Sequence, residues 1–262
     1  MTVHDIRDIL ARDEATVGTW LQLPSADVAE LMARAGYDWV AVDMEHGSFS
    51  PALLPNIFRA IEVGGAAPFA RLPIAEKTQI KAALEAGAQG LIFPMVESRE
   101  QLDVAIDLAT YPGQDTWRNP SEKAKEYRGV GYCRANVFGR DFDAYLHSRT
   151  PELFLVAQIE HIRAVEQLDF ILAHPRLDAI MVGPYDLSGS MGLTGQFEHP
   201  EFVKVMEQIQ KACQQRGARM GLHIVKPDQA ALEREIAAGS RFIAYGIDSV
   251  FLWGAAERPI LR

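Results

Sequence analysis

The sequence has few cysteines, no long apolar run and no excess of positive charge. Only two of its 262 residues are cysteines, Cys133 and Cys213, and they lie far apart in the sequence. Such scarcity argues against a disulfide framework and favours a reducing compartment. No apolar run approaches the roughly 20 residues that a membrane-spanning helix needs. These shortages argue against a small secreted scaffold and a membrane protein.

The charge balance narrows the class of partner. The net charge is −9 and the isoelectric point is near 5.3. An acidic chain is a poor match for nucleic acid or an anionic membrane as a main partner. Residues 1–14 are charged and lack the apolar core of a signal peptide. We therefore expect a cytoplasmic globular protein, and the composition indicates nothing finer.

Short apolar runs recur along the chain, and amphipathic segments separate them. Nearly continuous apolar character over a few residues is typical of parallel strands that helices cover. The intervening segments have the helical period, and several end in glycine. The predicted strands are 17–23, 39–44, 68–73, 90–96, 154–160, 179–184, 219–225 and 242–247, and the predicted helices are 25–36, 50–65, 75–87, 98–109, 163–174, 199–217 and 228–239.

Strand followed by helix, eight times in about 250 residues, predicts a (β/α)₈ TIM barrel. A doubly wound open sheet is the alternative, and the evenness of the eight units favours closure. We expect one domain over residues 1–262, because no linker divides the chain. One interval is long, with an irregular loop insertion around 110–132. Long loops in compact barrels are usually functional or mobile.

Polar residues follow the predicted strands, where barrel enzymes carry their chemistry. The stretch VAVDMEHG places Asp43, Glu45 and His46 directly after an apolar run. Ionisable groups so placed are costly unless water, a metal or a substrate meets them. Other strands supply further candidates at their ends: Arg71, Glu160, Asp186, His223 and Asp248.

Glu160 and Asp186 follow strands that should be neighbours in the barrel. Two adjacent carboxylates repel each other and raise each other's pKa, and a divalent cation removes that conflict. Mg²⁺ and Mn²⁺ often take only one or two carboxylates, with water and substrate as the other ligands. Alternatively, each carboxylate caps a helix or pairs with a surface arginine.

Other strand ends admit two interpretations each. Arg71 could clamp a substrate carboxylate, or it could form an ion pair with Glu45 or Asp43 at the rim. His46 could be a general base or a supporting hydrogen-bond partner. The turn at Gly183 and Pro184 could present backbone amides to an anion. We interpret His223 as structural.

In combination, these residues resemble the HpcH/HpaI family of metal-dependent (class II) pyruvate aldolases. The resemblance covers residues 17 to 250 in order. The segments that carry it are YDWVAVDMEHG, ARLP, QIKAALEAGAQGLIFPMV, YRGVGYCRAN, VAQIE and GPYDLSGSMG. It implies a barrel of the phosphoenolpyruvate/pyruvate superfamily and a reaction that cleaves a 4-hydroxy-2-oxo acid to pyruvate and an aldehyde. It also implies a homohexamer.

The resemblance also assigns roles to residues. Glu160 and Asp186 bind Mg²⁺ or Mn²⁺, or Co²⁺. Arg71 contacts the pyruvyl oxygen and the enolate, and His46 transfers a proton. The remaining positions are substrate-binding residues (Gly183, Pro184, Tyr185 and Arg128) and acidic residues beside the site (Asp43 and Glu45).

Glu85 departs from the family pattern, which usually has aspartate there. That acid is expected to orient the histidine of an adjacent subunit, so Glu85 is a catalytic candidate. Glutamate keeps the charge but is one methylene longer than aspartate, and the extra methylene alters the pairing with His46. Arg128 lies in a loop expected to approach the active site. With Arg118 and Lys125 it could attract an acidic aldehyde, although a solvated loop explains the last two as well.

Three other functions compete with this reading. A class I aldolase needs a buried lysine at a strand end, and the sequence offers only Lys226. A lyase or hydrolase acting on a CoA thioester would need a basic groove, which is not evident. A non-catalytic barrel that binds a carboxylic acid would have little need for Arg71, His46, Glu160 and Asp186 together.

Overall fold

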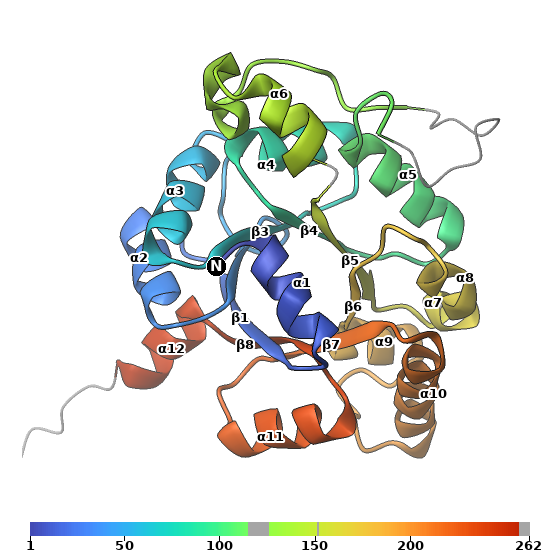
Figure 1. The fold of residues 1–262 in the computed structure, drawn as a ribbon. Coiled ribbons are helices and arrows are strands. Elements are labelled where there is room, and N and C mark those ends of the chain that lie inside the picture. Colours follow the sequence, from blue (N-terminus) through green and yellow to red (C-terminus); the bar gives the residue numbers. More distant parts are fainter. Residues whose placement is uncertain (115–125, 151, 257–262) are drawn as a thin grey trace, which may run out of the picture.

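The computed structural model describes residues 1–114, 126–150 and 152–256. Eight parallel strands pair in sequence order, and β8 pairs with β1, so the barrel is closed (Figure 1). The predicted TIM barrel is confirmed, and the open sheet is wrong. The strands are β1 (Thr16–Leu21), β2 (Trp39–Asp43), β3 (Ala67–Arg71), β4 (Gly90–Phe93), β5 (Phe154–Ile159), β6 (Ala179–Val182), β7 (Arg219–Ile224) and β8 (Phe242–Ile247).

Helices surround the barrel, and all seven predicted helical segments are helical. One differs in detail, because the segment predicted over 163–174 is two short helices that meet at Gln167, which leaves the helical conformation (φ −101°, ψ 6°). The helices that match predictions are α2 (Ala26–Arg34), α3 (Leu54–Gly64), α4 (Lys77–Ala86), α5 (Arg99–Ala109), α7 (Ile162–Glu166), α8 (Leu168–Leu172), α10 (Pro200–Arg216) and α11 (Gln229–Ala238).

Several helices were not predicted. Three of them build the excursion between α5 and β5: η1 (Arg134–Gly139), α6 (Phe142–Ala144) and η2 (Tyr145–Arg149). Arg118 and Lys125, from the predicted long loop, lie outside the described residues. The others are α1 (Val3–Ala11), α9 (Pro184–Ser190) and α12 (Asp248–Ala255).

Strand alternation separates two apolar layers. Along β5, Phe154 and Val156 point into the barrel, whereas Leu155, Ala157 and Ile159 pack against the surrounding helices. Successive side chains of a strand face opposite sides, so the inward positions are every second residue. At the carboxyl end of β5 the same inward face continues with Gln158 and Glu160. The alternation that builds the core therefore also aims polar groups at the site.

Aromatic rings fill the barrel interior. The ring of Trp39 stacks on Phe242 with centroids 4.4 Å apart, and Phe69 and Phe154 complete the cluster. Gly18 leaves room for Trp39, since a Cβ at Gly18 would lie 1.9 Å from a ring carbon. The interior is a packed core, so a ligand must bind at an end of the barrel.

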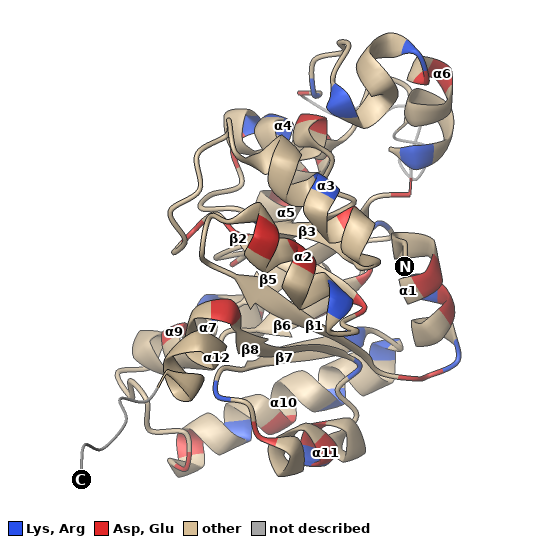
Figure 2. Cartoon of the chain, turned by 90° about the vertical axis from the view of Figure 1, so that its left-hand side faces the viewer, with Lys and Arg blue, Asp and Glu red and all other residues tan. Residues whose placement is uncertain are grey.

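Helix α1 closes the amino-terminal end. Its buried residues Val3, Ile6 and Leu10 belong to the same cluster as the interior aromatic rings. Arg7 ties it to the barrel, because its Nε donates to Asp178 Oδ1 at 2.7 Å. Seen from the side, α1 lies at one end of the barrel, whereas α9 and α12 lie at the other (Figure 2). Helix α1 therefore covers the end of the barrel opposite to the carboxyl ends of the strands.

Among the helices of the described ranges, none is both long enough and apolar enough to cross a membrane.

Candidate active site

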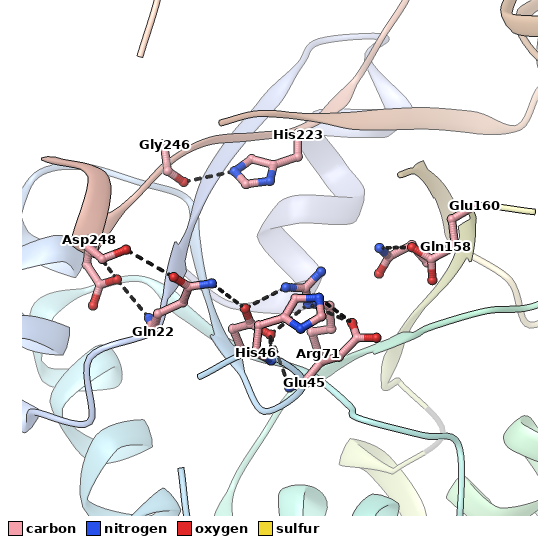
Figure 3. Close-up of polar contacts among 11 residues, drawn as sticks. Gln22, Glu45, His46, Arg71, Gln158, Glu160, His223, Gly246 and Asp248 are labelled. Carbon is pink, nitrogen blue, oxygen red and sulfur yellow. Dashed lines mark hydrogen bonds and ion pairs between the residues drawn. The ribbon is translucent and has the colours of Figure 1, made fainter. Parts of the chain in front are cut away.

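A cavity of about 200 Å³ opens at the carboxyl ends of the strands. Polar side chains from separate strands and the turns after them converge on it (Figure 3). Its polar lining residues are Gln22, His46, Arg71, Gln158, Tyr185, Asp186 and His223, and the predicted Gly183 and Pro184 line it as well. The predicted candidates His46, Arg71 and Asp186 are thus brought together, whereas Gln22 and Gln158 were not predicted.

Arg71 is the fixed cation of the site. Its Nε donates to Asp43 Oδ1 at 2.9 Å, and its Nη2 donates to Asp43 Oδ2 at 2.6 Å. Its guanidinium also lies over the ring of Trp20, 4.4 Å from the centroid. No described residue is a hydrogen-bond partner of Nη1. The rim ion pair predicted as an alternative therefore exists. It leaves the Nη1 group of Arg71 available to a ligand.

Asp43 is fully buried and accepts hydrogen bonds from several groups. Beside Arg71, these are the backbone amides of Glu45 and His46 and the side chain of Gln22, whose Nε2 lies 2.9 Å from Oδ2. Burial alone would raise the pKa of Asp43, but Arg71 outweighs it and the pKa lies below its usual value. Asp43 is thus an anion that holds Arg71 in place.

Glu45 and His46 lie at the mouth of the site. His46 is well exposed, and its Nε2 is 3.8 Å from Glu45 Oε2. Burial raises the pKa of Glu45, and the nearby Arg71 and His46 only partly oppose this shift. The Oε2 atom of Glu45 also lies 3.4 Å from Arg71 Nε. His46 is therefore accessible to solvent and substrate, as a group that exchanges protons requires.

Glu160 is buried, 2% exposed, and its carboxylate faces other acids. Its Oε1 accepts from the Met95 amide at 2.7 Å, and its Oε2 accepts from Gln158 Nε2 at 2.5 Å. Burial, aided by the negative charges of Glu45 and Asp186, raises the pKa of Glu160 to about 7. Met95 has a left-handed backbone (φ 49°), which is unusual without glycine. The strained backbone of Met95 therefore lies where its amide donates to Glu160.

The turn between β6 and α9 lines the same cavity as Arg71. Gly183 precedes α9, and Pro184 is its first residue. A Cβ at Gly183 would lie 2.6 Å from Glu160 Oε2, so a larger residue would displace this carboxylate. The backbone amides of Tyr185 and Asp186 lie in the first turn of α9, where helical partners are lacking. These amides are donors for an anionic group.

The donor set is compatible with a hard divalent cation. Glu160 and Asp186 repel each other, and a buried carboxylate with a raised pKa gains from a nearby cation. The Oε1 atom of Gln158 is buried without a hydrogen-bond partner. Within the described residues no group of three or more His, Cys, Asp or Glu side chains could hold a metal. Two carboxylates plus water and substrate oxygens is a ligand set that Mg²⁺ commonly takes.

Glu85 and Arg128 do not line this cavity. Glu85 lies on α4, where its Oε1 is 3.9 Å from Lys81 Nζ. Arg128 is buried, its guanidinium lies 4.1 Å from the centre of the Tyr111 ring, and its Nη1 donates to the Tyr145 hydroxyl at 3.2 Å. Their roles in catalysis or substrate binding stay predictions. For Glu85 the prediction concerns the histidine of an adjacent subunit.

The alternative nucleophile Lys226 is exposed in the turn after β7 and does not line the cavity. His223, interpreted from the sequence as structural, does line it. Asp248 holds the backbone next to the site in place. Its carboxylate accepts hydrogen bonds from the backbone amides of Gln22 and Leu23 at 2.8 Å each. The strand alternation described above is the sequence signal that places Gln22, Gln158 and His223 on inward positions.

Comparison with known proteins agrees with this arrangement. The model of the protein family described as "HpcH/HpaI aldolase/citrate lyase" matches residues 16–254 of this chain. The chain belongs to this HpcH/HpaI family. It is accordingly an enzyme of a carbon–carbon lyase family.

Two curated members illustrate the range of the HpcH/HpaI family. A 2-keto-3-deoxy-L-rhamnonate aldolase of Klebsiella pneumoniae is 32% identical over 96% of this chain and 90% of its own. A hydroxypyruvate/pyruvate aldolase of Paraburkholderia phytofirmans is 31% identical over 98% of this chain and 96% of its own. A crystal structure of a family member from Burkholderia cenocepacia superposes with a TM-score of 0.86 at 32% identity, covering 96% of this chain and 95% of that one.

Proposed function

We propose that this enzyme reversibly cleaves a 4-hydroxy-2-oxo acid to pyruvate and an aldehyde through a pyruvate enolate. The observation that carries the proposal is Arg71, which is held by a buried Asp43, keeps its Nη1 without a partner among the described residues and lines a cavity together with Gly183 and Asp186. The carboxylate of Glu160 lies beside that cavity, next to Gly183. The names of relatives, which include keto-deoxy acid and pyruvate aldolases, support the same class of substrate.

The residues divide the work among the parts of the substrate. The backbone amides of Tyr185 and Asp186, beside Gly183 and Pro184, bind the carboxylate of the 2-oxo acid. Arg71 donates to the keto oxygen and stabilises the negative charge that appears there as the enolate forms. Donors aimed at developing charge, in a site that excludes water, are usually the largest contribution to such catalysis.

Glu160 and Asp186 would hold a divalent cation, which the resemblance to the family indicates is Mg²⁺, Mn²⁺ or Co²⁺. When bound, this cofactor supplies Lewis acidity that acidifies the protons next to a ketone. The buried amide of Met95 and the side chain of Gln158 fix the orientation of Glu160. Gly183 gives that carboxylate the space it occupies.

His46 would transfer the proton of the aldol hydroxyl. It stands at the mouth of the cavity, where an aldehyde enters, and Glu45 lies beside its Nε2. In the cleavage direction His46 removes the proton from the 4-hydroxyl group as the carbon–carbon bond breaks. In the synthetic direction it returns the proton to the new alkoxide.

A panel of 4-hydroxy-2-oxo acids tests the proposal. Pyruvate release would be followed by coupled reduction to lactate, with Mg²⁺, Mn²⁺, Co²⁺ or EDTA. We expect release with at least one acid and one ion, and its loss with EDTA. Borohydride treatment with pyruvate should leave the chain unmodified, whereas a covalent adduct at Lys226 would indicate a class I enzyme. No release from any acid with any ion would contradict the proposal.

A further inference from the structure

His223 lines the cavity, but the proposed reaction gives its imidazole no role. It lies near the end of β7, and its ring meets Trp20 edge-on with centroids 5.6 Å apart. Its Nε2 is 3.3 Å from the carbonyl oxygen of Gly246 on β8. Polar side chains placed in small ligand cavities usually fix orientation or confer specificity.

The contact with Gly246 determines which ring nitrogen carries the proton. A carbonyl oxygen only accepts, so Nε2 must donate and Nδ1 keeps its lone pair when the ring is neutral. Burial, aided by the nearby charge of Arg71, lowers the pKa of His223 to about 4. The ring is therefore neutral at physiological pH. Figure 3 shows the second ring nitrogen on the side facing the cavity that His223 and Arg71 share.

The proposed pose directs one part of the substrate towards this nitrogen. The carboxylate would lie at the start of α9, after β6, and the keto oxygen would lie at Arg71 on β3. The remaining wall is formed by β7, β8 and β1, where the ring of Trp20 contacts both Arg71 and His223. A substituent on carbon 3 of the 2-oxo acid, the carbon that becomes nucleophilic, would point at this wall.

Gln22 supplies a side-chain amide at this wall, but both ends of that amide already have hydrogen-bond partners. Gln22 donates through Nε2 to Asp43, and its Oε1 accepts from the Ser249 hydroxyl at 3.1 Å. Neither Trp20 nor Ile247, which also line the cavity here, has an acceptor to offer in its side chain. Gln158, whose Oε1 also lacks a partner, lies on β5 and outside this wall. Among the described side chains that line the wall of β7, β8 and β1, Nδ1 of His223 is then the acceptor that a hydroxyl group on carbon 3 would meet.

We propose that His223 determines nucleophile specificity, by accepting a hydrogen bond from a 3-hydroxyl group, so that a 3-hydroxy-2-oxo acid is preferred over pyruvate. This inference rests on the proposed function, because the pose requires the carboxylate and keto oxygen to bind as described. Pyruvate, which has only a methyl group there, leaves Nδ1 without a donor.

The test compares hydroxypyruvate and pyruvate as nucleophiles with one fixed aldehyde, glycolaldehyde, in the full-length enzyme with Mg²⁺. We expect the ratio of their kcat/KM values, hydroxypyruvate over pyruvate, to exceed one in the wild type. His223→Leu keeps an apolar group of similar size but removes the acceptor, so the ratio should fall about tenfold, as for one neutral hydrogen bond. His223→Asn places an amide oxygen near the position of Nδ1 and should retain most of the preference.

Each other outcome decides something different. An unchanged ratio in His223→Leu would overturn the specificity role and leave the aldolase proposal intact. Equal loss of both reactions in the Leu and Asn variants would make His223 structural and would also overturn it. If the wild type adds neither nucleophile to the aldehyde and releases no pyruvate from the acid panel, the proposed function itself fails, and this inference fails with it.

Discussion

At the scale of single residues, the Asp43–Arg71 pair is the most constrained part of the site. Both carboxylate oxygens of the buried Asp43 accept hydrogen bonds from the guanidinium of Arg71. This paired contact fixes the position of the guanidinium, and the guanidinium keeps the carboxylate charged. A lysine could not replace Arg71, since a single ammonium group cannot contact both oxygens and the substrate in one plane. The ion pair and the clamp, which are alternatives when only the sequence is considered, are two parts of one arrangement.

His223 gives the molecule a pH dependence of stability that can be measured. The unfolded chain protonates this histidine below its ordinary pKa of 6.5, whereas the folded protein does so only near pH 4. Between these values the unfolded state holds more protons, so the free energy of unfolding decreases as the pH falls from 6.5 to 4. Above pH 6.5 both states are neutral and the effect is absent.

Urea unfolding of the wild type and His223→Asn between pH 8 and pH 4.5 would measure this effect. We expect the wild type to lose more stability than the variant on acidification, with a difference approaching about 3 kcal/mol, the equivalent of the pKa difference. Any effect of the substitution on packing shifts the whole curve and is seen at pH 8. Parallel curves for the two proteins would show that His223 titrates normally.

Which residues meet at the site could be predicted in part. Asp43, Glu45, His46, Arg71, Glu160 and Asp186 follow apolar runs, so their place at the strand ends was readable from the sequence. Gln22 and Gln158 were missed because they lie inside predicted strands and carry no charge. Met95 could not be found, since its contribution is a backbone amide in an unusual conformation, which any residue type can supply.

At the scale of elements, glycines inside the strands set how closely the aromatic rings pack. Gly18→Ala would place a Cβ 1.9 Å from a ring carbon of Trp39. Because Trp39 also stacks on Phe242, it has little room to move. We expect a destabilisation of about 1–3 kcal/mol or more, as is usual for overpacked cores. Thermal unfolding should show a Tm several degrees below that of the wild type.

Gly254→Ala is the matched control for that measurement. Gly254 lies in α12, and a Cβ there meets nothing within 4 Å. Alanine favours helix over glycine, so the Tm should stay equal or rise slightly. A Tm for Gly18→Ala equal to that of the wild type would mean that the aromatic cluster yields more easily than its packing indicates.

The elements themselves were the most predictable level, for a physical reason. Strands covered on both faces require continuous apolar runs, and helices that cover them require a regular apolar stripe. Helix α1 was missed because a helix that plugs the barrel end is short and rich in charge, with only Val3, Ile6 and Leu10 buried. The turns of η1, α6 and η2 were missed because their sequence has no regular period.

At the scale of the whole molecule, barrel closure brings distant strand ends into one cavity. Asp248 near the carboxyl end of the chain accepts from Gln22 near the beginning, and β8 pairs with β1. The eightfold repetition of the sequence predicted this closure. What one chain cannot supply is a neighbouring copy, so the predicted role of Glu85 towards the histidine of an adjacent subunit stays a prediction.

Hydrogen–deuterium exchange at the methyl group of pyruvate tests enolate formation most directly, because it needs no aldehyde. The methyl proton signal would be followed by NMR in D₂O with the enzyme and Mg²⁺. We expect the wild type to exchange these protons. Arg71→Ala should exchange them about 10²-fold more slowly or worse, as when an oxyanion donor is lost. No exchange by the wild type, or equal exchange by a folded Arg71→Ala variant, would contradict the assignment of Arg71 to the enolate.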